Sequence, residues 1–190
     1  MKTDRKDDSN DISGAHPDLG GWDEKDANGG EHCRNSAGIA AGCLQPVALQ
    51  KVGYLAGLLH DMGKYTAEYR TYLNRAVAGE PVRVGSVIHT HAAVRFLIEQ
   101  FHEPSAFTSF EDMSAEILAY AAGAHHGLYD CVDEQHRSGF SHRVAWDERL
   151  YSEAKDGFFS QCADEKEIQQ LFAQAHEQLL PDIRHRSAHK

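Results

Sequence analysis

Residues 58–64 read LLHDMGK, so an imidazole and a carboxylate follow directly on an apolar segment. Leu55 and Leu59 recur at helical intervals before the doublet His60-Asp61, which predicts a buried helix that ends there. Apolar surroundings disfavour charged or unpaired polar side chains, so both residues need a partner in the fold. We interpret the doublet as part of a metal centre.

A second doublet, His125-His126, follows the apolar segment 117–122 in the same way. Two adjacent imidazoles point in different directions, and each needs a hydrogen-bond or metal partner. Imidazole nitrogen and carboxylate oxygen together suit Zn, Fe, Mn, Ni or Co. We therefore expect one or two divalent transition metals, with Mg as a further option, at His60, Asp61, His125 and His126, with His32 and His89 as contributors.

These residues lie far apart in the sequence, so only a tertiary fold can gather them. Metal sites assembled from several helices are typical of catalytic centres in helical bundles. One Asp can bridge two cations, and a pair of metals roughly 3.5–4 Å apart activates water and stabilises in-line displacement at phosphorus. Lys64 follows Asp61 by three positions and is either a solvated lysine or a point charge for a substrate phosphate.

Helical patterns fill the chain from residue 31 onward. Pro46 is expected to begin a helix, and the amphipathic helix over residues 165–180 is expected to end at Pro181. Short β segments near residues 82–87 are the one departure from helix, and no full sheet is predicted. The fold class is therefore all-α, a single helical bundle of about six or seven helices with the metal site in its core.

Composition sets the domain organisation and the compartment. The 190 residues, 41% of them hydrophobic, are enough for one domain with a substantial core. Residues 1–30 are rich in Asp, Gly, Asn and Ser and predict a disordered tail, which leaves residues 31–190 as the domain. No apolar run approaches 18 residues and no secretory signal is visible, so a cytoplasmic protein with free thiols and no membrane contact is expected.

The formal net charge of −10 argues against a broad basic surface that grips nucleic acid. It is compatible with a phosphate substrate held through metal ions, because the cations then supply the local positive charge.

Three motifs in this order resemble a known family. Residues 60–64, HDMGK, are similar to the defining motif of HD-domain metal-dependent phosphohydrolases. With residues 88–93, IHTHAA, and residues 123–130, GAHHGLYD, the chain more narrowly resembles the HD nuclease domain of the CRISPR-associated type I nuclease–helicase. The resemblance covers roughly residues 31–180.

The resemblance implies a nuclease that cuts single-stranded DNA, with RNA as a further substrate, in CRISPR antiviral defence. It implies two partners, a helicase that feeds the displaced strand and an RNA-guided surveillance complex that opens the duplex. It places Lys64 beside the scissile phosphate, and it places metal ligands at His32, His60, Asp61, His89, His125 and His126.

The chain also departs from the family pattern. Ile88 stands where the family has an aspartate, Ala93 where it has a glycine, and the late family Asp has no counterpart, so a domain truncated at its C-terminus is expected. Spacing alone leaves His89 and His91 as competitors for one position. Two other functions stay open: an HD phosphohydrolase of nucleotides or cyclic nucleotides, and a non-catalytic, metal-stabilised docking module.

Overall fold

The computed structural model describes residues 29–103, 108–126 and 139–187, with side chains to His185. These residues contain α-helices, short 3-10 helices and no strand, which confirms the all-α prediction. The α-helices are α1 (Gly29–Leu44), α2 (Gln50–Leu59), α3 (Ala67–Val77), α4 (His91–Phe101), α5 (Phe110–Gly123), α6 (Gly139–Val144), α7 (Glu148–Gln161) and α8 (Glu165–Ser187). Two 3-10 turns, η2 (Gln45–Val47) and η3 (Met62–Tyr65), flank α2.

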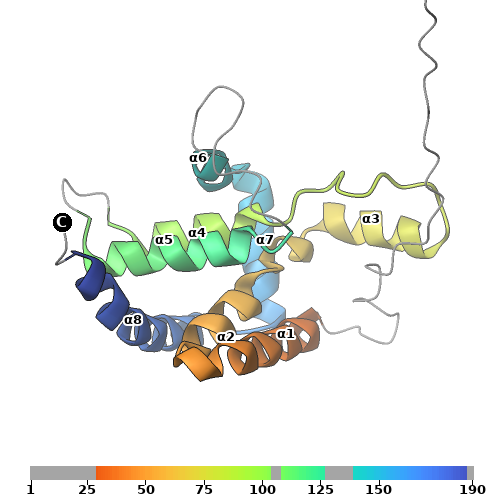
Figure 1. The fold of residues 1–190 in the computed structure, drawn as a ribbon. Helices are drawn as coiled ribbons and strands as arrows, with labels where there is room; N and C mark the ends of the chain where they lie inside the picture. The colour runs from red at the N-terminus through yellow and green to blue at the C-terminus, as the bar shows by residue number, and fades with distance from the viewer. Residues whose placement is uncertain (1–28, 104–107, 127–138, 188–190) are drawn as a thin grey trace, which may run out of the picture.

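Helices α1 and α2 form an antiparallel pair whose backbones approach closely (Figure 1). Glycines on α2 make this approach possible, because a Cβ at Gly57 would lie 2.9 Å from the Cα of Ala37, and one at Gly53 would collide with the carbonyl of Ala40. Pro46 lies in the first turn of η2, as the sequence predicts, and Ala48 closes the connection in a left-handed conformation with φ 58°. The small residues therefore hold the N-terminal end of α1 beside the C-terminal end of α2.

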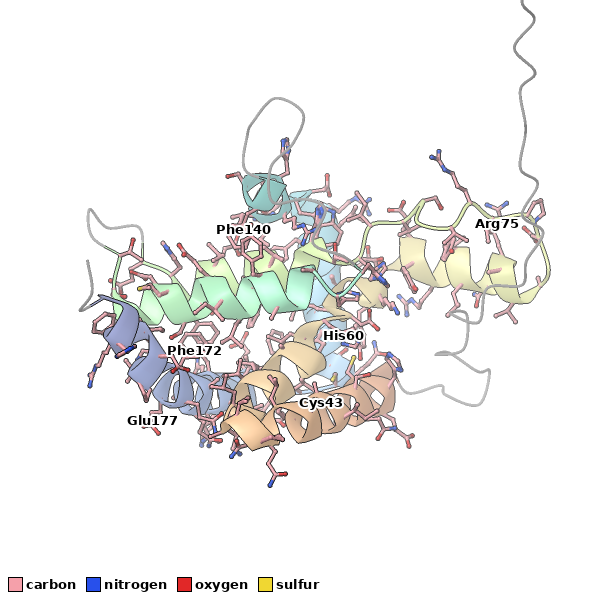
Figure 2. The ribbon with its side chains drawn as sticks, viewed as in Figure 1. Cys43, His60, Arg75, Phe140, Phe172 and Glu177 are labelled. Carbon is pink, nitrogen blue, oxygen red and sulfur yellow. The ribbon has the colours of Figure 1, made fainter. Side chains whose placement is uncertain are left out.

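The core lies between this pair and the layer of α4 and α5, with α8 packed against both α2 and α5 (Figure 1). Phe172 of α8 lies between α8 and that layer, where its ring stacks on Phe101 at a centroid distance of 3.8 Å (Figure 2). Helix α7 packs against η3, which follows the His60-Asp61 doublet. The largest fully buried apolar side chains include Leu55, Leu58, Leu97, Leu118, Phe158 and Ile168.

Helix α3 extends away from the bundle as an arm, and the segment 78–90 runs back alongside it to α4 (Figure 1). Thr66 caps the first turn of α3 by accepting a hydrogen bond from the Tyr69 amide. Gly79, with φ 73°, turns the chain at the far end, where Arg75 pairs with Glu80 at 2.7 Å. The arm is therefore α3 together with the returning segment 78–90. Because His89 lies near the end of this segment, the arm leads back to the candidate metal ligands.

The structure corrects three details of the sequence analysis. Helix α8 does not end at Pro181 but continues to Ser187, because Leu179 and Ile183 extend one buried face across the proline. Residues 82–87 form turns and irregular backbone in place of β segments. Helix α1 begins at Gly29, inside the predicted tail; residues 1–28 lie outside the described part.

The described residues contain one α-helix more than the upper bound of the prediction, because the short helix α6 and the mixed polar helix α7 carry no clear apolar pattern. No helix within the described ranges combines the length and the apolar composition that are needed to cross a bilayer.

The continuation of α8 through Pro181 can be tested by replacing this exposed residue with alanine. A proline inside a helix removes one backbone hydrogen bond, so Pro181→Ala should raise the free energy of unfolding by about 1–2 kcal/mol. Gln174→Ala, at an exposed position of the same helix, is the control and should stay within about 0.5 kcal/mol of the parent. Urea denaturation measures both, and equal midpoints for the two variants would show that the helix ends before Pro181.

Candidate metal centre

The six predicted ligand residues come from the ends of four α-helices. His32 lies in the first turn of α1, and His60-Asp61 lies between α2 and η3. His89 lies two residues before the start of α4, and His125-His126 follows the end of α5. All six meet where α1, α2, α4 and α5 end around one buried carboxylate; Figure 2 shows His60 at this junction.

Asp61 is the centre of the site, and its side chain is only 1% exposed. Its Oδ2 lies 2.8 Å from Nε2 of His60 and 3.1 Å from Nε2 of His32. Nζ of Lys64 lies 2.8 Å from the same oxygen, so this lysine forms an ion pair with the carboxylate.

The other carboxylate oxygen faces the second doublet. Asp61 Oδ1 lies 3.6 Å from Nε2 of His125 and 3.8 Å from Nε2 of His89, both beyond hydrogen-bond distance. Asp61 Oδ1 and His125 Nε2 are buried and make no hydrogen bond within the described residues. Buried polar atoms without partners are rare in folded proteins, so this pair of atoms requires an explanation.

Backbone carbonyls fix the orientation of two of the imidazoles. Nδ1 of His60 lies 2.7 Å from the carbonyl oxygen of Gly57, and Nδ1 of His125 lies 2.8 Å from that of Ala122. A carbonyl only accepts, so each Nδ1 carries a proton, and each ring directs its Nε2 toward Asp61. This is the arrangement in which metal-binding histidines are usually held, with Nδ1 donating and Nε2 left for the ion.

A lone pair that faces a carboxylate oxygen is unfavourable unless a proton or a cation lies between them. Burial lowers the pKa of His125 to about 4 and that of His89 to about 4, so both rings are neutral near pH 7. A divalent cation between His125 Nε2 and Asp61 Oδ1 would satisfy both unpaired atoms at once. The donor set therefore fits a metal ion better than it fits a purely hydrogen-bonded core.

Asp61 is ionised in this surrounding. Burial by itself would raise the pKa of the Asp61 carboxyl, but hydrogen bonds from His32 and His60 and the charges of His60 and Lys64 outweigh it. The net effect holds the pKa of Asp61 well below its usual range. The carboxylate is therefore ready to bind a cation across the whole physiological pH range.

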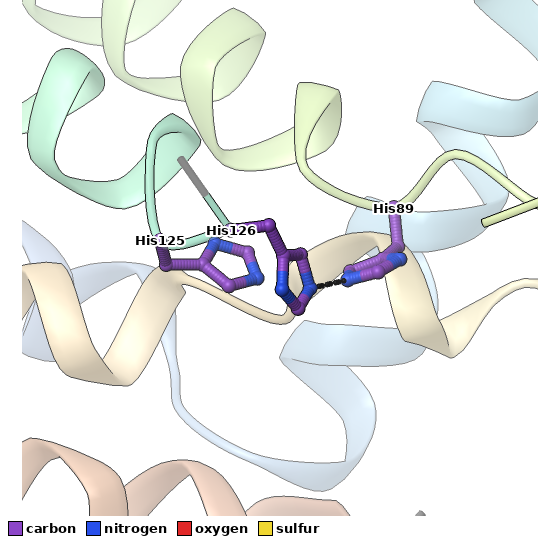
Figure 3. Close-up of side chains that lie close together, drawn as sticks. All are labelled: His89, His125 and His126. Atoms are coloured by element: carbon purple, nitrogen blue, oxygen red, sulfur yellow. Dashed lines mark hydrogen bonds between the residues drawn. The ribbon is translucent and has the colours of Figure 1, made fainter. Parts of the chain in front are cut away.

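The donors form two groups that could each hold one ion, and in each group the ligand atoms lie within 4.8 Å of one another. The first group is His32, His60 and Asp61; the second is His89, His125 and His126. In the second group, shown in Figure 3, Nε2 of His89 lies 2.8 Å from Nε2 of His126. Because Asp61 presents one oxygen to each group, the geometry suits a carboxylate that bridges two cations.

The two histidines of the second motif lie in different places. His89 faces the centre, whereas His91 begins α4 and its ring lies 6.3 Å from that of Trp146. Of the third motif, residues 127–130 lie outside the described part. His126 is the most exposed of the six candidate ligands.

Two further residues belong to the site although the sequence analysis gave them no role there. A Cβ at Gly63 would collide with the backbone of His89, so this glycine lets η3 pack directly against the backbone of the second motif, residues 88–93. The ring of Tyr69 lies 5.2 Å from that of His89, and Nζ of Lys64 lies 5.5 Å from the Tyr69 centroid. The HDxGK spacing contained the signal for Gly63, but only the fold shows what the glycine faces.

Comparisons of the chain with protein-family models, curated proteins and solved structures found no match. The functional assignment therefore depends on the geometry of the site together with the motifs.

Gly63→Ala tests the close approach that positions His89. The added Cβ must push η3 and His89 apart, which should lower the free energy of unfolding by about 1–3 kcal/mol. It should also reduce the stabilisation by Mn²⁺, because His89 moves relative to Asp61. Urea denaturation with and without Mn²⁺ measures both effects.

Gly42→Ala is the matched control, since nothing lies within 4 Å of a Cβ at that position of α1. It should stabilise the protein by about 0.5–1 kcal/mol and leave the response to Mn²⁺ unchanged. If Gly63→Ala behaves like Gly42→Ala, the tight packing of η3 under His89 is not real.

Proposed function

We propose that this chain is a metal-dependent nuclease that hydrolyses phosphodiester bonds in single-stranded DNA, with RNA as a second polymer to test. The observation that carries the proposal is the pair of three-residue donor groups, one of which contains Asp61 while the other faces the second oxygen of its carboxylate. Two-metal centres of this kind are common in phosphatases and nucleases.

Each residue has a distinct part in this proposal. His32 and His60 would hold one cation, and His89, His125 and His126 the other, with Asp61 between them. When bound, divalent cations supply Lewis acidity and make a water molecule nucleophilic near neutral pH. The neutral state of His89 and His125 keeps their lone pairs available without removal of a proton.

Lys64 is the residue proposed to face the substrate. In the structure Nζ of Lys64 lies 2.8 Å from Oδ2 of Asp61, and the lysine offsets the negative charge of this carboxylate. A cation beside Asp61 would take over that electrostatic role and release the ammonium group toward an incoming phosphate. The side chain is partly accessible, at 13% exposure, so it lies between the buried carboxylate and the surface.

The biological setting of the proposal depends on the motifs alone. The order HDMGK, IHTHAA and GAHHGLYD supports a role in CRISPR antiviral defence, beside a helicase and an RNA-guided surveillance complex. The two rival functions use the same centre: a phosphohydrolase would act on free nucleotides or cyclic nucleotides, and a docking module would bind metal without turnover.

One set of assays separates these functions. The protein with Mn²⁺, Ni²⁺ or Co²⁺ should nick single-stranded circular DNA, and a chelator should stop the reaction. A panel of nucleotides and cyclic nucleotides is run beside the DNA. Hydrolysis of nucleotides alone would point to the phosphohydrolase, and thermal stabilisation by metal without hydrolysis of any phosphodiester would point to the docking module.

Asp61→Asn tests the bridging carboxylate. This variant should lower the rate of cleavage by at least about 100-fold, because the charge that holds the cations is lost. It should also abolish most of the metal-induced stabilisation, which for the parent is about 2–3 kcal/mol at a metal concentration near 100 times Kd. Circular dichroism checks that the helices persist.

Asp156→Asn, at an exposed position of α7, is the matched control and should match the parent in rate and in metal response. Cleavage that survives Asp61→Asn at the parent rate would exclude the centre as the active site.

A further inference from the structure

A cavity of about 350 Å³ lies on the arm, between α3 and the returning segment 78–90. Tyr72 and Arg75 of α3 line one side, and Val82, Arg83 and Val87 of the returning segment line the other. The volume falls within the range of small-ligand sites, and the lining combines apolar side chains with a few charged ones. Neither the metal centre nor the proposed chemistry uses this cavity.

Aromatic rings connect the cavity to the metal centre. The ring of Tyr69 lies 5.2 Å from that of His89 on one side and 5.7 Å from that of Tyr72 on the other. Tyr72 therefore belongs to the cavity wall and is separated from a candidate metal ligand by a single side chain. A nucleic-acid strand that contacted both the cavity and the metal centre would need to span only the width of the Tyr69 side chain.

The arm differs in charge from the rest of the chain. Between residues 67 and 90, which cover α3 and the returning segment, the cationic residues are Arg70, Arg75 and Arg83 and the acidic ones are Glu68 and Glu80, whereas the whole chain has a net charge of −10. The arm is therefore a locally basic element on an acidic protein. Such a local patch can attract a polyanion that the remaining surface repels.

The two arginines of the cavity are accessible to an anion. Arg75 pairs with Glu80, but both side chains are more than half exposed, at 53% and 52%. Exposed pairs of this kind contribute little stability, so exchange of the carboxylate for a phosphate costs little. Arg83 has no ion-pair partner within the described residues.

Glu68 also lines the cavity and repels a phosphate placed beside it. The phosphate position therefore lies with Arg75 and Arg83. A carboxylate can instead accept hydrogen bonds from the exocyclic amino group of a base. The cavity thus offers a cationic place for the backbone and an apolar, aromatic place with one acceptor for a base.

We propose that this cavity binds one unpaired nucleotide of a single strand, with its base against Tyr72, Val82 and Val87 and its phosphate at Arg75 and Arg83. A base in a duplex is already stacked and paired, so the site selects single strands over duplexes. The identification of that strand as the substrate rests on the proposed nuclease function, but the binding itself does not require cleavage.

Binding is measured by fluorescence anisotropy of a labelled single-stranded oligonucleotide of about ten mixed bases, with chelator present so that no cleavage occurs. The parent should bind this probe more tightly than the duplex of the same length. Tyr72→Ala should weaken binding about tenfold, and Tyr72→Phe should retain the parent affinity because the ring is kept. Circular dichroism and the affinity of Tyr72→Phe separate loss of stacking from loss of fold.

The arginines are tested through salt dependence. Arg75→Ala combined with Arg83→Ala should weaken binding and reduce the slope of log affinity against log salt by about 0.7, because the contact to one phosphate is lost. Arg149→Ala, at an exposed residue of α7, is the control and should change neither quantity.

The outcomes distinguish this inference from the proposed nuclease function. Parent-like binding by Tyr72→Ala and by the double arginine variant would overturn the inference, even if the protein cleaves DNA. Equal affinity for single strand and duplex would also overturn it. Cavity-dependent binding without metal-dependent cleavage would uphold the inference and refute the nuclease.

Discussion

The burial of one ionised carboxylate is the constraint on which the rest of the structure depends. Asp61 is 1% exposed, and an uncompensated charge at such a position costs several kcal/mol. Its compensation comes from side chains on separate elements: His32 of α1, His60 at the end of α2 and Lys64 of η3. The helix ends must therefore meet at one point, and glycines at 57 and 63 allow the backbones to come close enough.

Protons of lysine and imidazole satisfy only one of the two oxygens of the Asp61 carboxylate. Oδ2 of Asp61 is satisfied by His32, His60 and Lys64, whereas Oδ1 and the Nε2 of His125 are buried together without a hydrogen bond. Since His125 is neutral near pH 7, its lone pair and the carboxylate oxygen repel each other unless a cation separates them. This asymmetry within one side chain is the physical reason to place a metal ion at the centre, and it does not depend on any resemblance to other proteins.

The sequence predicts the all-α class and the residues that meet, because buried polar doublets at the ends of apolar helices have few stable arrangements. It does not predict that α8 passes through Pro181, since the burial of Ile183 depends on tertiary packing that local propensity does not contain. The choice of His89 over His91 likewise depends on where α4 begins. The arm was beyond sequence reasoning: its cavity forms only because residues 78–90 return alongside α3.

Anomalous diffraction from crystals grown with Mn²⁺ tests the central claim most directly. The account predicts at least one anomalous peak at a bonding distance, about 2.0–2.3 Å, from an Asp61 oxygen, and a second peak among His89, His125 and His126 at full occupancy. A protein crystallised with excess Mn²⁺ that shows no peak near Asp61, with His60 and Lys64 still in direct contact with the carboxylate, would contradict it.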